Sequence, residues 1–184
     1  MPRLLDQLQQ DHRHLSRLLD LLDTLLDQFH AGNEPDYELM AEMLEYLESY
    51  ADQVHHPTEE VIFARLLEFG EEMRRPIDVL VHQHVLLSQL NKRFRQALEG
   101  IVHGEVLLRE DVERLGRELV STLRKHADLE EAEVFPFARE RLSEADWRAI
   151  EDAAPKINDP IFADPDPARF RALFQHLLAQ AGMG

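Results

Sequence analysis

Four stretches of this chain place apolar residues at steps of three and four, which is the spacing of one face of an α-helix. Each apolar face is too wide to leave in water, and short segments connect the four stretches. We therefore expect an all-α fold in which four long helices form an up-down-up-down four-helix bundle. The expected helices span roughly Pro2 to His30, Tyr37 to Phe69, Pro76 to Gly104 and Leu107 to Pro136.

Proline, glycine and capping residues set the ends of these helices. Gly32 to Pro35 ends the first helix, and Asp36 fits the N-cap of the second. Pro57 lies inside the second helix and predicts a kink or a lost hydrogen bond there. Pro76 suits the first position of the third helix. Pro136 marks a break or kink in the fourth.

The last part of the chain has a different character. Ser143 to Asp146 fits a capping box that opens a short helix, and the proline-rich and aspartate-rich segment Pro155 to Pro167 predicts a loop. Asp166-Pro167 then resembles the start of a final helix ending near Ala179. We therefore divide the chain into a four-helix bundle over residues 1–142 and a helical extension over residues 143–184. The apolar face of the last helix would pack on the bundle or on a partner chain, which allows a homodimer.

Composition limits the kind of protein and the kind of partner. A chain of 184 residues suits one domain with a sizeable core. The formal net charge of -16 disfavours nucleic acid and anionic membrane surfaces as partners. The chain holds no cysteine, so any metal would be bound by nitrogen and oxygen. With no membrane-spanning run and no signal peptide, we expect a cytoplasmic protein.

Histidine is the anomaly of the composition, with ten residues in the chain. Two helices carry a His four residues before a Glu, at His55 and Glu59 and again at His126 and Glu130. This spacing stacks both side chains on one helix face. Both pairs continue the apolar face, where buried carboxylates cost several kcal/mol unless they are paired or bind a metal. No Lys or Arg lies on these faces, so a multivalent cation is the natural compensation.

The other two expected helices each add a His at a matching level. His12 is early in the first helix and His84 early in the third, whereas the two His-Glu pairs are late in the second and fourth. In an antiparallel bundle these four points meet at one end. The predicted metal ligands are His12, His55, Glu59, His84, His126 and Glu130.

Nearby polar residues have simpler interpretations. We favour a solvent-facing position for His56, although distortion by Pro57 would let it act as a seventh ligand. His14, His30, His82, His103 and His176 are assigned to surface or packing roles, with His14 at the edge of the apolar face. Glu60 and Glu131 face solvent or orient a ligating His. Tyr46 and Tyr50 are interpreted first as packing residues.

The combined pattern resembles the hemerythrin-like, or HHE cation-binding, domains. It consists of Asp11-His12, the segment His55 to Glu60, His84, the segment His126 to Glu131 and the following Val134-Phe135-Pro136. The resemblance covers about residues 1–142 and implies a non-haem di-iron site in which the two Glu bridge the irons and the His cap them. Members of the family are associated with binding or sensing of O2, NO or redox state.

The pattern departs from the oxygen-carrying hemerythrins, which take two His, four residues apart, from the third helix. Here the second of those positions is Ser88, and the fourth helix carries Glu130 where those proteins have a more distant Asp. Fewer His ligands leave coordination positions open, which favours sensing or redox chemistry over simple O2 carriage.

We therefore predict a di-iron protein that binds O2, NO or a peroxide, and we favour binding or sensing over enzymatic activity. A di-iron oxidase, peroxidase or catalase-like oxidoreductase is the first alternative. A metal-free structural bundle or an iron-storage protein is the second. Zn and Mn also suit four imidazoles and two carboxylates, so the choice of iron follows from the resemblance.

Overall fold

The computed structural model describes residues 3–181, which are helical with connecting turns and loops and contain no strand. The all-α class predicted from the sequence is therefore confirmed. The helical elements are α1 (Arg3–His30), α2 (Tyr37–Tyr46), η1 (Leu47–His55), α3 (His56–Leu67), α4 (Arg74–Val102), α5 (Arg109–Leu129), η2 (Glu130–Val134), α6 (Phe135–Arg141), α7 (Glu144–Ala153) and α8 (Arg171–Ala181).

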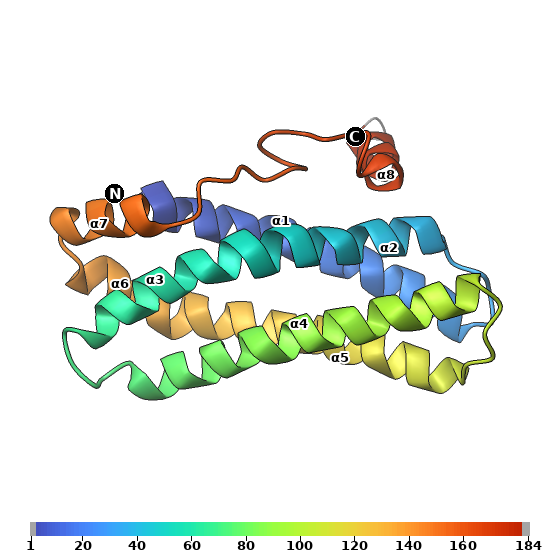
Figure 1. Cartoon of the computed structure of the whole chain (residues 1–184), viewed down its shortest axis with the longest axis horizontal. Coiled ribbons are helices and arrows are strands. Elements are labelled where there is room, and N and C mark those ends of the chain that lie inside the picture. The colour runs from blue at the N-terminus through green and yellow to red at the C-terminus, as the bar shows by residue number, and fades with distance from the viewer. Residues whose placement is uncertain (1–2, 182–184) are drawn as a thin grey trace.

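The long helices lie side by side along the long axis of the molecule (Figure 1). Helix α1 packs against α5 and α2, and α4 packs against α5, α2 and α3. Two hydrophobic clusters fill the space between them. The larger cluster surrounds Leu22, Leu44 and Phe94, and the smaller one surrounds Leu8 and Ile62. The polar residues predicted to bind metal lie in a layer between these two clusters.

Both expected kinks take the form of a π-helical segment rather than a break. The wide turns η1 and η2 each end two residues before a proline, Pro57 or Pro136, and the helix then continues. Proline lacks the N–H of a normal helical turn, and its ring collides with the carbonyl four residues earlier. A π turn shifts the hydrogen-bond register to five residues and accommodates both problems.

Some helices begin where the sequence predicts, and others begin at a different residue. Asp36 is the N-cap of α2 and accepts a hydrogen bond from the Leu39 amide at 2.9 Å, as predicted. Helix α4 begins at Arg74, so Pro76 is its third residue instead of its first. Proline is tolerated at the third position as well, because the amides of the first turn have no helical acceptor. Pro2, the predicted start of the first helix, lies outside the described residues.

The C-terminal segment begins with the predicted capping box. The Ser143 hydroxyl accepts from the Asp146 amide, and the Asp146 carboxylate accepts from the Ser143 amide. The last helix starts later than expected, at Arg171. The Asp166 side chain accepts from the Arg169 amide, but this contact closes a single turn that precedes the helix.

Helix α8 packs on the bundle of the same chain, against α2. The carboxylate of Glu42 accepts from the amides of Ala172 and Leu173, at 3.0 and 2.8 Å, and so caps the first turn of α8. Phe170 and Leu173 are fully buried in the larger hydrophobic cluster. These contacts hold the predicted extension on the bundle, while the domain boundary at residue 142 stays a prediction.

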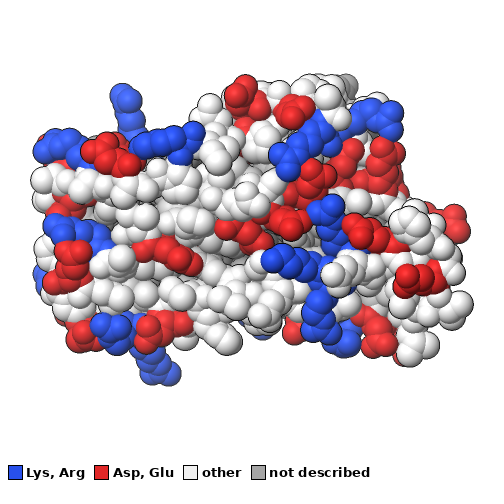
Figure 2. All heavy atoms as spheres, viewed as in Figure 1, with Lys and Arg blue, Asp and Glu red and all other residues white. Residues whose placement is uncertain are grey.

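Acidic and basic side chains are interspersed on the face of the molecule shown in Figure 2. Ion pairs also connect neighbouring helices, such as those of Arg117 with Asp23 and Arg124 with Asp20 between α5 and α1. None of the helices among the described residues is long and apolar enough to cross a membrane.

Candidate metal centre

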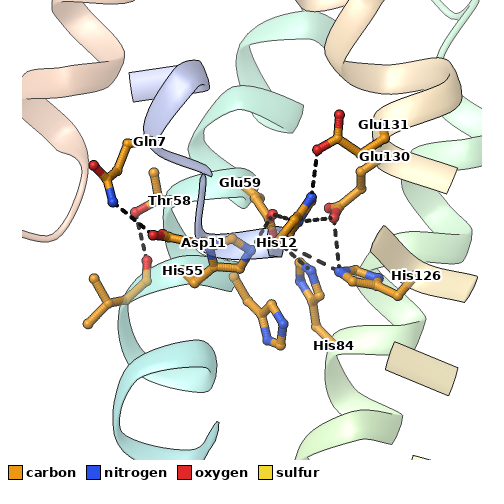
Figure 3. Close-up of polar contacts among 12 residues, drawn as sticks. Gln7, Asp11, His12, His55, Thr58, Glu59, His84, His126, Glu130 and Glu131 are labelled. Carbon is orange, nitrogen blue, oxygen red and sulfur yellow. Dashed lines mark hydrogen bonds and ion pairs between the residues drawn. The ribbon is translucent and has the colours of Figure 1, made fainter. Parts of the chain in front are cut away.

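The candidate site collects side chains from all four long helical segments. His12 comes from α1, His55 and Glu59 from the junction of η1 and α3, and His84 from α4. His126 and Glu130 come from the junction of α5 and η2. All six predicted ligands are buried and lie together (Figure 3), and both Glu side chains have no exposed surface.

The inward-facing atoms of this cluster lack hydrogen bonds. They are the Nε2 atoms of His12, His55, His84 and His126 and both carboxylate oxygens of Glu59 and of Glu130. The nearest of these atoms are only 2.9 to 3.4 Å apart, yet none of them makes a hydrogen bond of acceptable geometry. Buried polar groups without partners are costly, so the cluster is incomplete as a set of protein atoms.

Glu59 divides the cluster into two groups. Its Oε1 lies 2.9 Å from Nε2 of His55 and 3.4 Å from Nε2 of His12. Its Oε2 lies 3.4 Å from Nε2 of His84 and 3.9 Å from Nε2 of His126. Each group has the spacing of a cation site, and the two groups share this one carboxylate. Glu130 lies between them on the other side, with Oε2 at 3.2 Å from His12 and 3.3 Å from His126.

His56 belongs to the second of these groups, so the preferred solvent-facing position is wrong. Its side chain is 4% exposed, its Nε2 has no hydrogen bond, and it lies with Glu59, His84 and His126 within the spacing of a cation site. Its ring stacks on that of His84 with centroids 4.3 Å apart. Two successive residues, His55 and His56, thus face the same centre at the end of the π segment η1. The only signal in the sequence is the adjacent Pro57.

The outer nitrogen of each ring has its own partner. Nδ1 of His12 lies 3.0 Å from Glu131, and Nδ1 of His84 lies 2.9 Å from Glu60. These contacts match the orienting role considered for the two Glu residues. The other partners, which the sequence did not indicate, are Asp11 for His55, Asp52 for His56 and Gln83 for His126. A partner that accepts from Nδ1–H leaves Nε2 as the lone-pair donor, which is the form that binds metals.

The remaining histidines lie outside this cluster. His30, His82 and His103 are exposed, and His176 is half-buried on α8. His14 is half-buried and stacks on Phe162 of the C-terminal loop, with ring centroids 3.8 Å apart. It lies near Asp11 and Asp159 and does not reach the main cluster.

Comparison with protein families decides what kind of domain this is. The chain matches the hemerythrin HHE cation binding domain over residues 3–138, with a second match to the same domain over residues 75–180. The chain belongs to this family. No curated protein and no solved structure matches it. Family membership and the His/Glu clusters together fit a metal-binding protein.

Charge in this hemerythrin-family site is balanced in the metal-free protein by protons. Burial alone lowers the pKa of His12, but the nearby carboxylates of Glu130, Glu131 and Glu59 outweigh it and raise that pKa to about 12. Burial likewise opposes the protonated form of His55, and Glu59 and Asp11 raise its pKa to about 9.

The pKa values of the two carboxylates, Glu59 and Glu130, shift in opposite directions. Burial favours protonated Glu59, yet the surrounding His55, His12 and His126 hold the pKa of Glu59 well below its usual range. Burial and the charge of Glu59 raise the pKa of Glu130. Because metal-binding imidazoles must be deprotonated at Nε2, metal binding has to displace the protons held here.

Proposed function

We propose that this hemerythrin-family protein binds two metal ions, most simply two irons, through seven side chains. They are the six predicted ligands and His56, so that five imidazole nitrogens and four carboxylate oxygens surround the centre. The observation that carries the proposal is that all nine atoms are buried without a hydrogen bond, while the outer atom of every ring has a partner. The up-down-up-down four-helix arrangement predicted from the sequence is the framework for this site.

The proposed ligands are distributed unequally. His56, His84 and His126 surround one position, whereas His12 and His55 surround the other, with Glu59 common to both. With His56 included, the second helical segment supplies the fifth imidazole that oxygen-carrying hemerythrins take from the third helix. The position with two imidazoles has fewer protein ligands and therefore more room for a small ligand. Two bound irons would supply one-electron redox chemistry at this open position.

The protein's own residues prepare that position in three ways. Asp11, Glu131 and the other outer partners fix the ring orientations and tautomers. Both hydrophobic clusters exclude bulk water from above and below the polar layer. The surplus protons on the metal-free cluster leave when metal enters. These features support binding or sensing of O2, NO, a peroxide or redox state, with cytoplasmic location as a further prediction.

The alternatives are an oxidoreductase acting at the same centre and a metal-free or iron-storage bundle. A pocket lined by three of the candidate ligands favours the oxidoreductase as the first alternative, because it would give a substrate access to the centre. The metal-free alternative leaves nine buried polar atoms without compensation, which makes it the weaker one.

The test is elemental analysis of protein purified without chelator or added metal, with absorption spectra in air and after anaerobic reduction. The proposal expects about two irons per chain and near-ultraviolet bands that bleach on reduction. His56→Ala and Glu130→Ala should each lower the metal content, whereas the exposed controls His82→Ala and Glu133→Ala should not.

Stoichiometric zinc or manganese would retain the ligand set and remove the O2 chemistry. Absence of metal, with none taken up on reconstitution, would overturn the proposal. Turnover of hydrogen peroxide by the iron-loaded protein would favour the oxidoreductase.

A further inference from the structure

A pocket of about 460 Å³ lies between α1 and α5, beside the candidate metal centre. Three of the residues that line it are His12, His55 and His126. The first two are the imidazoles of the position with fewer protein ligands. A molecule in this pocket would therefore lie against the more open side of the centre.

The size of the pocket exceeds what a diatomic ligand needs. A water molecule occupies about 30 Å³ in the liquid, and O2 or NO is of similar size. Pockets of about 300 to 1,000 Å³ with mostly apolar walls and a few polar groups are typical of sites for small organic molecules. This pocket falls within that range, so its volume points to an organic ligand in addition to a small gas.

The chemistry of the lining indicates the class of that ligand. Leu15, Leu19, Leu123 and Ala127 form an apolar wall, and Arg13 and Arg124 bring positive charge to the same pocket. An aliphatic chain of a few carbons would pack on the wall. A negatively charged group would be drawn to the guanidinium groups.

Arg124 provides a donor that lacks an acceptor. Its Nη2 donates to Asp20 and Asp23, both at 2.9 Å, and these ion pairs anchor the side chain. Its Nε is buried, so a molecule in the pocket would meet the more exposed Nη1, for which the described residues supply no acceptor. Two acidic residues, Asp128 and Glu131, also line the pocket, and Glu131 is already engaged by Nδ1 of His12 and by the side-chain amide of Gln9. A ligand acceptor would complete Arg124 without displacing either contact.

We propose that this pocket binds a small aliphatic carboxylate, with its chain on the leucine wall and its carboxylate at Arg124. The proposal rests on the proposed function in one respect, since it places this molecule beside the metal position formed by His12 and His55. It assigns a substrate or effector class to the protein that the metal ligands alone do not indicate.

The experiment is calorimetric titration of the purified full-length protein with hexanoate, with hexanol as a probe of equal chain length but no charge. We expect hexanoate to bind at least about tenfold more tightly than hexanol, because a hydrogen bond to a charged group contributes about 1.5 kcal/mol or more. Arg124→Gln should weaken hexanoate binding about tenfold and leave hexanol binding almost unchanged.

Ala127→Leu should weaken both probes by at least about tenfold, because the added side chain fills the pocket. Ala153→Leu, an exposed change on α7 away from the pocket, is the matched control and should bind both probes as the unmodified protein does. Thermal unfolding of each variant checks that the fold is retained.

Metal content measured on the same samples separates the two proposals. Absence of hexanoate binding by protein that holds two metal ions would overturn the pocket proposal alone. Binding that Ala127→Leu does not weaken would also overturn it, and equal binding of hexanol would overturn the carboxylate class. Binding with the expected variant pattern in protein that takes up no metal would support the carboxylate site and overturn the metal centre.

Discussion

Asp11 holds the imidazole of His55 from the side opposite the candidate metal centre, with Oδ2 3.2 Å from Nδ1. The same oxygen accepts the hydroxyl of Tyr50 at 3.0 Å, and Oδ1 accepts the amide of Gln7 at 2.8 Å. Asp11 and His55 are both buried. The carboxylate is thus fixed by two further donors, and it fixes the tautomer that leaves Nε2 of His55 free for a metal.

Asp11→Ala should therefore weaken metal binding without removing a ligand. Loss of an outer partner of a metal-bound His typically costs about 10-fold to 100-fold in affinity. Competition with a chelator of known affinity measures the change. Asp6→Ala, an exposed change one and a half turns earlier on α1, is the control and should leave the affinity as it is. Equal affinities for the two variants would show that Asp11 does not support His55 in this way.

Tyr50→Phe should have a smaller effect on the same measurement. The change removes one donor to Asp11 and retains the ring that stacks near Tyr46, with centroids 5.5 Å apart. Asp11 would then accept more strongly from His55. The absorption spectrum and the midpoint reduction potential of an iron-loaded centre should therefore shift, while the metal content is retained. Tyr37→Phe, distant from the site on α2, is the control. An unchanged spectrum and midpoint would assign Tyr50 to packing alone.

Asp159 attaches the C-terminal loop to the bundle. Its Oδ2 accepts the hydroxyl of buried Tyr46 at 2.9 Å, and its Oδ1 accepts the amides of Ile161 and Phe162 at 2.8 and 3.0 Å. Asp159→Ala leaves these donors unpaired, and each buried donor without a partner costs about 1 to 3 kcal/mol. We expect faster proteolytic cleavage within residues 155–170 and a lower unfolding midpoint in urea. Asp164→Ala, an exposed change in the same loop, should behave as the unmodified protein does.

The inward-facing positions of the six predicted ligands could be predicted from the sequence because helical spacing fixes the face on which each residue lies. His126 and Glu130 follow Leu119 and Leu123 on one face, and the structure buries all four. Helix order and direction then set the common level along the bundle. The first step depends only on the period of the helix, and the second depends only on the antiparallel order of the helices.

His56 could not be placed in this way because it lies where the period changes. A residue next to an inward-facing position on a regular α-helix turns away by about 100°, which would have pointed His56 outward. The π segment η1 ends at His55 and alters that angle locally. Asp52 and Gln83 were missed for a related reason, because their roles depend on contacts with rings of neighbouring turns and helices. Asp11 was noted only as the neighbour of His12.

Gly116 permits the close approach of α5 to α1 and α4. A Cβ at this position would lie 2.6 Å from a methyl of Leu26 and 2.9 Å from the ring of Phe94, both fully buried. Gly116→Ala should therefore destabilise the protein by about 1 to 3 kcal/mol despite the better helix propensity of Ala. Gly100→Ala is the control, because its Cβ would meet mainly the flexible side chain of Glu105. Denaturant unfolding that ranks the two variants in the opposite order would contradict this packing.

The protons on the metal-free site predict an opposite pH dependence for the metal-free and metal-loaded proteins. In the folded metal-free chain the pKa of His55 is raised from 6.5 to about 9, and that of His84 is also raised, after burial is outweighed by Glu59. A raised histidine pKa stabilises the fold fully below the unfolded value, and this contribution is lost as the pH rises through the folded value. The free energy of unfolding of metal-free protein should therefore fall between pH 7 and pH 9.

The metal-loaded protein should lose no stability over the same interval, because its imidazoles are already deprotonated at Nε2 and metal binding strengthens as proton competition falls. Chemical denaturation at pH 7, 8 and 9, with and without bound metal, measures both trends. Metal addition at pH 7 in weakly buffered solution should also release protons. His126→Ala, which cannot form the complete centre, should show the metal-free trend under both conditions. A metal-free protein whose stability rises from pH 7 to pH 9 would show that the buried histidines are neutral and would contradict this charge balance.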